Sequence, residues 1–131
     1  MNATRQSMKK RILVVDDNAS DTQLLKRYLE ENHDYVVCEE NDPKAALSRA
    51  EKFQPHLILL DVLMPEMDGG ELAASFKANP KLKAVPIVFL TSKLTKKEVA
   101  LCGGVVGGYQ FLAKPIVLPE VAECLMRHLV K

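Results

Sequence analysis

The sequence predicts a doubly wound α/β fold, with five parallel strands and five helices, and three observations support this prediction. Short apolar segments alternate with amphipathic segments along nearly the whole chain. Residues 12–15, 57–60 and 87–90 are continuously apolar, as strands of a parallel sheet are when helices cover both faces. With 131 residues, 47% hydrophobic and 27% charged, the chain is long enough for one domain with its own core. Alternation of this kind is typical of a layered α/β domain.

Five segments are predicted as strands: residues 12–15, 35–38, 57–60, 87–90 and 109–112. Helices between them are predicted from apolar side chains that recur three or four residues apart and so form a stripe. These stripes are Leu24, Leu25, Tyr28 and Leu29; Ala46, Leu47, Ala50 and Phe53; Leu72 and Phe76; and Val117, Leu118, Val121, Leu125 and Leu129. The remaining helix, the fourth, is predicted from a capping box at Thr95 and Glu98.

The sequence also predicts where several helices begin and end. A capping box of Ser20 and Gln23 is predicted to open the first helix. Asp42 is predicted as the N-cap of the second helix, with Pro43 at its first helical position. The third helix is predicted to end near Asn79, because the residue before a proline disfavours helical backbone.

Composition argues against several classes of protein. The formal net charge of +1 provides no overall field toward nucleic acid or an anionic membrane. No apolar run is long enough to span a bilayer, and the polar residues 1–9 indicate an N-terminal arm rather than a signal peptide. The three cysteines fit neither a zinc-binding spacing nor a disulfide framework, and they indicate a reducing cytoplasm. Residues 10–131 are therefore expected to form one cytoplasmic domain.

Polar residues follow the predicted strands at the point where each strand ends. Asp16 and Asp17 follow the first strand, Asp61 the third, Thr91 the fourth and Lys114 the fifth. In an open parallel sheet the carboxyl ends of the strands meet at one edge, and ligands bind there. We therefore expect these five side chains to converge on one pocket.

The predicted pocket combines acids, an ammonium group and a hydroxyl group. Three clustered carboxylates repel one another unless a cation lies among them, and an acidic cluster of oxygen ligands suits Mg²⁺. One carboxylate can then act as a nucleophile toward phosphorus, while the other groups stabilise charge on the phosphoryl oxygens. Each residue alone has an ordinary structural explanation, such as a helix cap or a turn. Their joint occurrence at successive strand ends favours a phosphoryl-transfer site.

Four motifs coincide with these strand ends: Asp16-Asp17, residues 61–69 (DVLMPEMDG), residues 90–92 (LTS) and residues 107–115 (GGYQFLAKP). With these motifs the chain resembles the receiver domains of two-component response regulators, including the chemotaxis type. The resemblance covers nearly the whole chain from Lys10 onward. It implies a flavodoxin-like fold with strand order 2-1-3-4-5.

The resemblance implies a role for each acidic residue. Asp61 is expected to be the phosphoacceptor. Mg²⁺ is expected to be bound by Asp61, Asp17 and the backbone carbonyl of Leu63, with Asp16 acting largely through a bound water. Leu63 and Lys93 are expected to flank the route of the water that removes the phosphoryl group. Leucine cannot orient a water by hydrogen bonding, and Lys93 is expected to cover the phosphoryl group, so we expect slow autodephosphorylation. The alternative is that Lys93 simply points to solvent.

The other site residues are expected to respond to the phosphoryl group. Lys114 is expected to pair with its oxygens, and Thr91 to move inward and hydrogen-bond it. Phe111 is expected to be the coupled aromatic switch, the alternative being simple core packing. The resemblance also implies a cis peptide bond between Lys114 and Pro115.

By this resemblance the protein is a phosphorylation-operated switch and not an enzyme acting on external substrates. A histidine kinase or a histidine phosphotransfer protein is expected to donate the phosphoryl group to Asp61. The change is expected to reach the surface of the fourth helix, the fifth strand and the last helix, which protein partners read. A phosphorylation-dependent homodimer is compatible with this expectation. The chain is either a stand-alone regulator or a piece of a longer one, and neither nucleic acid nor a membrane is an expected partner.

Three other classes share parts of the pattern. Haloacid-dehalogenase-type phosphatases also use a strand-end Asp and Mg²⁺, but they carry a second Asp two residues later, where this chain has Leu63. Flavodoxin-like electron carriers need a phosphate-binding loop after the first strand, where Asp16 and Asp17 would repel a phosphate. A pseudo-receiver is never phosphorylated, and the complete set of acids with Thr91 and Lys114 argues against it.

Overall fold

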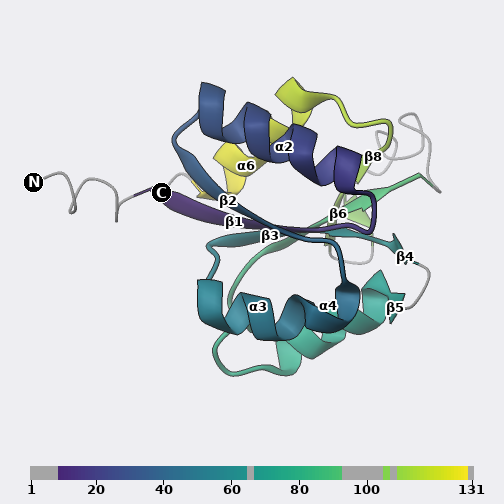
Figure 1. Cartoon of the computed structure of the whole chain (residues 1–131). Helices are drawn as coiled ribbons and strands as arrows, with labels where there is room; N and C mark the ends of the chain where they lie inside the picture. The colour runs from purple at the N-terminus through teal and green to yellow at the C-terminus, as the bar shows by residue number, and fades with distance from the viewer. Residues whose placement is uncertain (1–8, 65–66, 93–104, 107–108, 130–131) are drawn as a thin grey trace, which may run out of the picture.

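The computed structural model of the chain describes residues 9–64, 67–92, 105–106 and 109–129. Two layers of helices enclose a central sheet (Figure 1). Of the predicted N-terminal arm, residues 1–9, only Lys9 is described. Lys93 and the fourth helix predicted at Thr95 and Glu98 also lie outside the described residues.

Five parallel strands form most of the central sheet. They are β1 (Lys10–Val15), β2 (Tyr35–Glu40), β3 (Leu57–Asp61), β6 (Ile87–Thr91) and β8 (Tyr109–Ala113). Their order is β2-β1-β3-β6-β8, and each neighbouring pair is parallel. The five predicted strands and the predicted order 2-1-3-4-5 are confirmed. This order puts β1 and β3 side by side, so their carboxyl ends lie next to each other at one edge of the sheet.

Three further strands are too short for the hydrophobic pattern to predict. β7 (Val105–Val106) pairs antiparallel with β8 and is the sixth strand of the main sheet within the described ranges. β4 (Leu63–Met64) and β5 (Met67–Asp68) form a separate antiparallel ladder directly after β3. Valine favours strands, and pairing with β8 covers part of an edge that would otherwise be open. A two-residue strand cannot show the alternation that identifies longer strands in a sequence.

The described helices lie on both faces of the sheet (Figure 1). α2 (Ala19–Asn32) and α6 (Leu118–Leu129) cover one face. The short 3₁₀ turn η1 (Pro43–Ala45) leads into α3 (Ala46–Phe53), which covers the other face together with α4 (Gly69–Ala78). Four of the five predicted helices are therefore confirmed.

Two residues of the predicted stripes are exposed. Leu24 of α2 is 45% exposed, and Val117 is 37% exposed and precedes α6. The buried side of α2 is instead formed by Thr22, Leu25 and Leu29. A stripe read from apolar residues alone missed Thr22, whose hydroxyl donates to the carbonyl of Ala19 inside the helix.

β1 contributes to the cores on both faces. Ile12 and Val14 pack with residues of α2 and α6, whereas Leu13 and Val15 pack with residues of α3 and α4. All four side chains are fully buried. Side chains alternate between the two faces of a strand, and helices cover both faces here. This arrangement explains why the segment is continuously apolar.

The start of α2 differs from the prediction. Its N-cap is Asn18, whose side chain accepts a hydrogen bond from the backbone nitrogen of Asp21 at 3.1 Å. The predicted capping box of Ser20 and Gln23 is therefore wrong, because Ser20 lies inside the helix. The side chain of Asp16 accepts a hydrogen bond from the backbone nitrogen of Asn18 at 3.0 Å. The turn after β1 thus places the cap two residues earlier than the capping-box pattern suggests.

The other described helix ends agree with the prediction. Asp42 caps η1, with Pro43 as its first residue, and its side chain accepts a hydrogen bond from the nitrogen of Lys44 at 3.0 Å. α4 ends at Ala78, and Asn79 is its C-cap. These signals depend on local backbone chemistry, so they can be predicted from the sequence without knowledge of the tertiary structure.

β2 lies at one edge of the sheet, and two side chains of α2 form hydrogen bonds with the backbone of Val37 at its centre. Lys26 Nζ donates to the carbonyl of Val37 at 2.8 Å, and Glu30 accepts from the nitrogen of Val37 at 2.9 Å. Charged groups at an edge oppose pairing with another chain.

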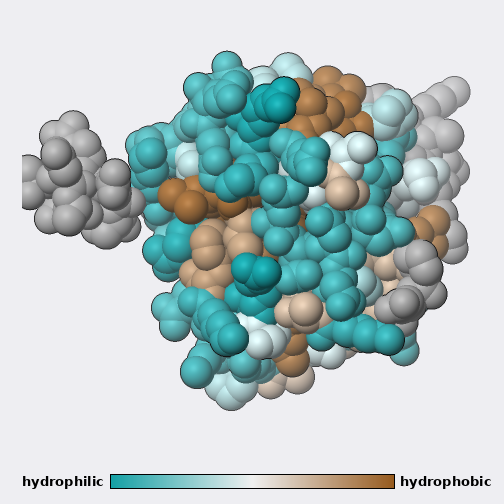
Figure 2. Space-filling view, viewed as in Figure 1, coloured by the Kyte–Doolittle hydropathy of each residue, from teal (hydrophilic) through white to brown (hydrophobic). Residues whose placement is uncertain are grey.

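Figure 2, in the same view as Figure 1, shows hydrophilic residues over most of the visible face. None of the described helices is long and apolar enough to cross a bilayer.

Candidate functional site

The carboxyl ends of four neighbouring strands bring the predicted site residues to one edge of the sheet. Asp61 is the last residue of β3 and Thr91 the last of β6. Asp16 directly follows β1, and Lys114 directly follows β8. The sheet order β1-β3-β6-β8 places all four strand ends in a row. Ligands of open α/β sheets bind at this kind of edge.

Asp16, Asp17 and Asp61 form an acidic cluster. One carboxylate oxygen from each lies within 4.8 Å of the other two. Asp16 and Asp61 are buried, whereas Asp17 is exposed. Oxygen ligands suit Mg²⁺, an ion that usually retains several waters, and the exposed Asp17 gives the cluster contact with solvent. The three residues therefore fit a hard divalent cation.

Hydrogen bonds orient the two buried acids differently. Asp16 Oδ1 accepts from the nitrogen of Asn18 at 3.0 Å, and its Oδ2 accepts from Lys114 Nζ at 2.8 Å. Asp61 Oδ1 accepts from the nitrogen of Leu63 at 3.4 Å, at the long end of the hydrogen-bond range. Both oxygens of Asp16 are engaged by short bonds, which favours Asp61 over Asp16 as a nucleophile.

The ammonium group of Lys114 lies among three carboxylates. Its Nζ is 2.8 Å from Asp16 Oδ2, 3.2 Å from Asp21 Oδ2 and 3.8 Å from Asp61 Oδ1. The ammonium is thus hydrogen-bonded on the β1–α2 side of the site and only in ion-pair range of Asp61. A cis peptide bond joins Lys114 to Pro115, as the resemblance implies.

The surroundings of Asp61 and Lys114 shift the pKa of both groups. Burial and then the negative charge of Asp16 raise the pKa of Asp61 to about 6, against the opposing ammonium of Lys114 and hydrogen bond from Leu63. Burial alone would lower the pKa of Lys114, but the hydrogen bond and charge of Asp16 outweigh it and raise that pKa above its usual value. In the metal-free protein Asp61 therefore titrates close to neutrality, while Lys114 stays protonated.

Thr91 lies in β6, the neighbour of β3, and Phe111 lies in β8, the next strand along. Thr91 is buried at the end of β6, and Phe111 is half-buried in β8. The ring of Phe111 stacks on Phe89, with centroids 5.0 Å apart and planes at 25°. Phe89 also meets Tyr109 edge-on, with centroids 5.0 Å apart. A half-buried ring in an aromatic cluster fits both packing and movement, so the switch role of Phe111 stays a prediction.

Leu63 and Asp21 complete the surroundings of the site. Leu63 lies two residues after Asp61 and is 43% exposed. Asp21 was not among the predicted site residues, although its carboxylate lies 3.2 Å from Lys114. The signal that could have found it is its position in the first turn of the helix that follows Asp16 and Asp17 directly, at the same edge of the sheet.

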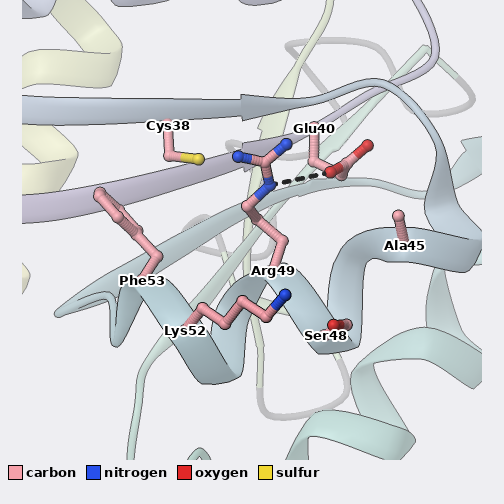
Figure 3. Close-up of a pocket in the computed structure, with 7 residues that line it drawn as sticks. All are labelled: Cys38, Glu40, Ala45, Ser48, Arg49, Lys52 and Phe53. Carbon is pink, nitrogen blue, oxygen red and sulfur yellow. Dashed lines mark hydrogen bonds and ion pairs between the residues drawn. The ribbon is translucent and has the colours of Figure 1, made fainter.

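A separate hollow lies between β2 and α3 (Figure 3). Its lining residues are Cys38, Glu40, Ala45, Ser48, Arg49, Lys52 and Phe53. Arg49 Nε donates to Glu40 Oε1 at 3.2 Å within it. Burial raises the pKa of the Cys38 thiol, with the charge of Arg49 opposing. None of the predicted site residues lines this hollow, so it is distinct from the edge that carries the acids.

A family model described as the response regulator receiver domain matches residues 12–125. The Vibrio cholerae chemotaxis protein CheY4 has a similar structure, with a TM-score of 0.78 and 30% identity over 92% of this chain and 99% of that one. The two-component response regulator ARR17 of Arabidopsis thaliana is 33% identical over 91% of this chain and 84% of its own length.

Longer proteins match as well. Response regulator PleD of Caulobacter vibrioides is 38% identical over 83% of this chain, which covers 24% of PleD. A probable cyclic di-GMP phosphodiesterase of Vibrio cholerae is 30% identical over 90% of this chain, which covers 26% of that protein. The chain thus spans about a quarter of the length of these curated relatives.

Proposed function

Since the chain belongs to the response regulator receiver domain family, whose members are phosphoacceptor switches of two-component signalling, we propose that Asp61 receives the phosphoryl group. One observation carries the proposal. Asp61 is a buried carboxylate at the end of β3, clustered with Asp16 and Asp17 and 3.8 Å from Lys114. A carboxylate placed among an ammonium and potential metal ligands suits nucleophilic attack on phosphorus.

In the proposed reaction, a carboxylate oxygen of Asp61 attacks the phosphorus of a phosphohistidine. The phosphorus–nitrogen bond breaks, the imidazole of the donor leaves, and the product is an acyl phosphate. Lys114 then pairs with one phosphoryl oxygen, and the hydroxyl of Thr91 donates a hydrogen bond to another. Within the site, the protein acts by positioning and by charge stabilisation.

Chemical mapping tests the proposal directly. The protein is incubated with acetyl phosphate and Mg²⁺ and then reduced with borohydride, which converts an aspartyl phosphate to homoserine. Peptide mass spectrometry is expected to find homoserine at position 61. Homoserine at Asp16 or Asp17 instead, or no modification by acetyl phosphate or a phosphorylated histidine kinase, would overturn the assignment.

A phosphatase is the alternative that this geometry argues against. A phosphatase of the haloacid-dehalogenase type would need an acid two residues after Asp61, and that position is the apolar, exposed Leu63. We therefore propose that the site supports only its own phosphorylation and autodephosphorylation.

Mg²⁺ is proposed to bind through Asp17, Asp61 and the backbone carbonyl of Leu63, with Asp16 acting through a water. When bound, the ion would neutralise charge on the phosphoryl oxygens. Replacing Asp17 with alanine is expected to weaken Mg²⁺ binding about tenfold or more, because this ion uses few protein ligands. Isothermal titration calorimetry measures the effect. Asp34→Ala is the matched control, since Asp34 is exposed and pairs with Lys9 at 3.8 Å; an equal loss in both variants would remove Asp17 from the ligand set.

The same proposal predicts the pH dependence of Mg²⁺ binding. The pKa of Asp61 is about 6 in the metal-free protein, and the carboxyl has to lose its proton before it binds the ion. The apparent affinity is therefore expected to fall about tenfold between pH 7 and pH 5, because the ionised fraction of Asp61 falls by that factor. Affinity that stays constant over this range would contradict Asp61 as a ligand.

The phosphoryl group is proposed to be long-lived. Leu63 beside Asp61 is exposed and apolar, so it offers no hydrogen bond to an attacking water. The double variant Leu63→Asn, Lys93→Glu is expected to shorten the phosphoryl lifetime severalfold, because both new side chains can orient water. Decay of the phosphorylated mass with time measures this. Leu24→Asn is a control, since Leu24 is similarly exposed on α2; a slower double variant would contradict the idea.

Receiver domains take their phosphoryl group from histidine kinases or phosphotransfer proteins. We propose that phosphorylation here draws Thr91 inward, moves Phe111, and changes a surface that includes β8 and α6. The stacking of Phe111 on Phe89 supports the idea that a shift at the end of β6 reaches β8. A protein partner that reads this surface, a homodimer formed on phosphorylation and a cytoplasmic location are parts of the same proposal.

A further inference from the structure

Asp21, a carboxylate outside the acidic cluster, contacts the ammonium group of Lys114. Asp21 lies in the first turn of α2, and its Oδ2 is 3.2 Å from Lys114 Nζ. This distance is shorter than the 3.8 Å that separates Lys114 from Asp61. Asp21 is not a member of the acidic cluster that fits a cation. It therefore reaches the site through Lys114.

The cap of α2 fixes the position of Asp21. The backbone nitrogen of Asp21 donates to the side chain of Asn18 at 3.1 Å, and the nitrogen of Asn18 donates to Asp16 at 3.0 Å. Asp16 and Asp21, which both bind Lys114, thus belong to one hydrogen-bonded turn after β1. Because the turn is held by its own hydrogen bonds, Lys114 has to break two contacts to leave it.

We propose that Asp21 is a positioning residue that holds Lys114 beside Asp16 in the unphosphorylated protein and so restrains phosphoryl uptake at Asp61. This inference rests on the proposed role of Asp61. The ammonium group of Lys114 donates a hydrogen bond to Asp16 and forms an ion pair with Asp21 at 3.2 Å, while Asp61 is beyond hydrogen-bond range at 3.8 Å. Lys114 must approach the phosphoryl oxygens during transfer, so contacts that hold it back slow the reaction.

The negative charge of Asp21 is also expected to slow phosphoryl uptake. Its side chain is 29% exposed, so its negative charge is expected to repel a negatively charged phosphodonor that reaches the site. Removing that charge is also expected to weaken Mg²⁺ binding, so the comparison is made at saturating Mg²⁺. Under this condition Asp21→Asn, which keeps the size of the side chain, is expected to accelerate phosphoryl uptake roughly three- to tenfold.

The assay follows the protein mass during reaction with acetyl phosphate, because the chain has no tryptophan to report on the site by fluorescence. Asp21→Glu restores the charge and is expected to react at nearly the wild-type rate. Glu31→Gln removes the same charge from an exposed position of α2 and is also expected to leave the rate unchanged. Equal rates for Asp21→Asn and wild type, or equal acceleration by Glu31→Gln, would overturn the proposal.

Measuring the effect of Asp21→Asn in the Lys114→Gln variant separates positioning of Lys114 from simple charge repulsion of the donor. If Asp21 acts by holding Lys114, most of the acceleration caused by Asp21→Asn disappears when Lys114 is replaced by glutamine. If the full acceleration persists in Lys114→Gln, Asp21 acts only on the incoming donor and the positioning role is wrong. The cycle of four proteins measures the coupling between the two residues.

The contact is also tested without phosphorylation, by urea unfolding of the metal-free proteins. Asp21→Asn is expected to lower the unfolding midpoint by about 0.5 M urea more when Lys114 is present than when it is glutamine, because the loss of a negative charge from the first turn of α2 is common to both backgrounds. Should Lys114→Gln fail to fold, the cycle is repeated with Asp61→Asn in all four proteins, which removes one buried charge. A zero coupling overturns the inference. Failure of the wild type to take up a phosphoryl group at Asp61 instead overturns the proposed function, and the two failures are thus distinguishable.

Discussion

Replacing Asp61 with asparagine is expected to abolish phosphoryl uptake. The amide keeps the size and shape of the carboxyl group but has no ionised oxygen to attack phosphorus. The variant and the wild type are incubated with acetyl phosphate or with a phosphorylated histidine kinase, and their intact masses are compared. Asp34→Asn is the control for charge, because Asp34 is exposed and distant from the acidic cluster. A full mass gain of one phosphoryl group on Asp61→Asn would refute the assignment.

The same variant is expected to be more stable than the wild type when Mg²⁺ is absent. Folding raises the pKa of Asp61 to about 6, above its value in the unfolded chain, so the native state binds a proton that the unfolded state has lost. The corresponding stability is present below about pH 4 and is lost as the pH rises through about 6. At pH 7.5 the neutral asparagine avoids this loss, and the gain is on the order of 1–3 kcal/mol. Urea unfolding at pH 4 and pH 7.5 measures it; a gain of the same size at both pH values would contradict the explanation.

The sequence predicts the strands well because burial on both faces of the sheet makes them continuously apolar. Residues such as Leu13 and Val14 face opposite cores, so both have to be apolar, and no polar position interrupts the segment. Local signals were reliable where backbone chemistry decides, as at Asp42 and Asn79. The cap of α2 was predicted wrongly because the side chain of Asp16, which belongs to the site, organises the turn.

The sequence predicts which residues meet at the site, but it does not predict the distances between them. Strand-end placement brings Asp16, Asp61 and Lys114 together, as the sequence suggests. The sequence could not show that Lys114 lies closer to Asp16 and Asp21 than to Asp61, because that choice depends on the exact position of α2 over the sheet. Nor could an alternation pattern reveal the two-residue strands that follow Asp61.

Replacing Gly69 with alanine is expected to destabilise the protein by about 2–4 kcal/mol, because α4 starts against the backbone at the end of β3. A Cβ at Gly69 would lie 2.5 Å from the carbonyl oxygen of Asp61 and 2.8 Å from the Cα of Val62. The nitrogen of Gly69 also donates to the carbonyl of Val62 at 3.0 Å. Backbone atoms cannot turn aside as a flexible side chain can, so the start of α4 has to move away from Asp61. We therefore expect slower phosphoryl uptake as well as lower stability.

Gly70→Ala is the matched control for this prediction. Gly70 is exposed, and a Cβ there would lie 3.2 Å from the side-chain oxygen of Asp68, which can shift slightly. Alanine favours a helix over glycine by about 1 kcal/mol, so this change is expected to be neutral or stabilising. Urea unfolding and the rate of mass gain with acetyl phosphate are measured for both variants. If Gly69→Ala unfolds at the same urea concentration as Gly70→Ala, the close approach of α4 to Asp61 does not require glycine, and the prediction is wrong.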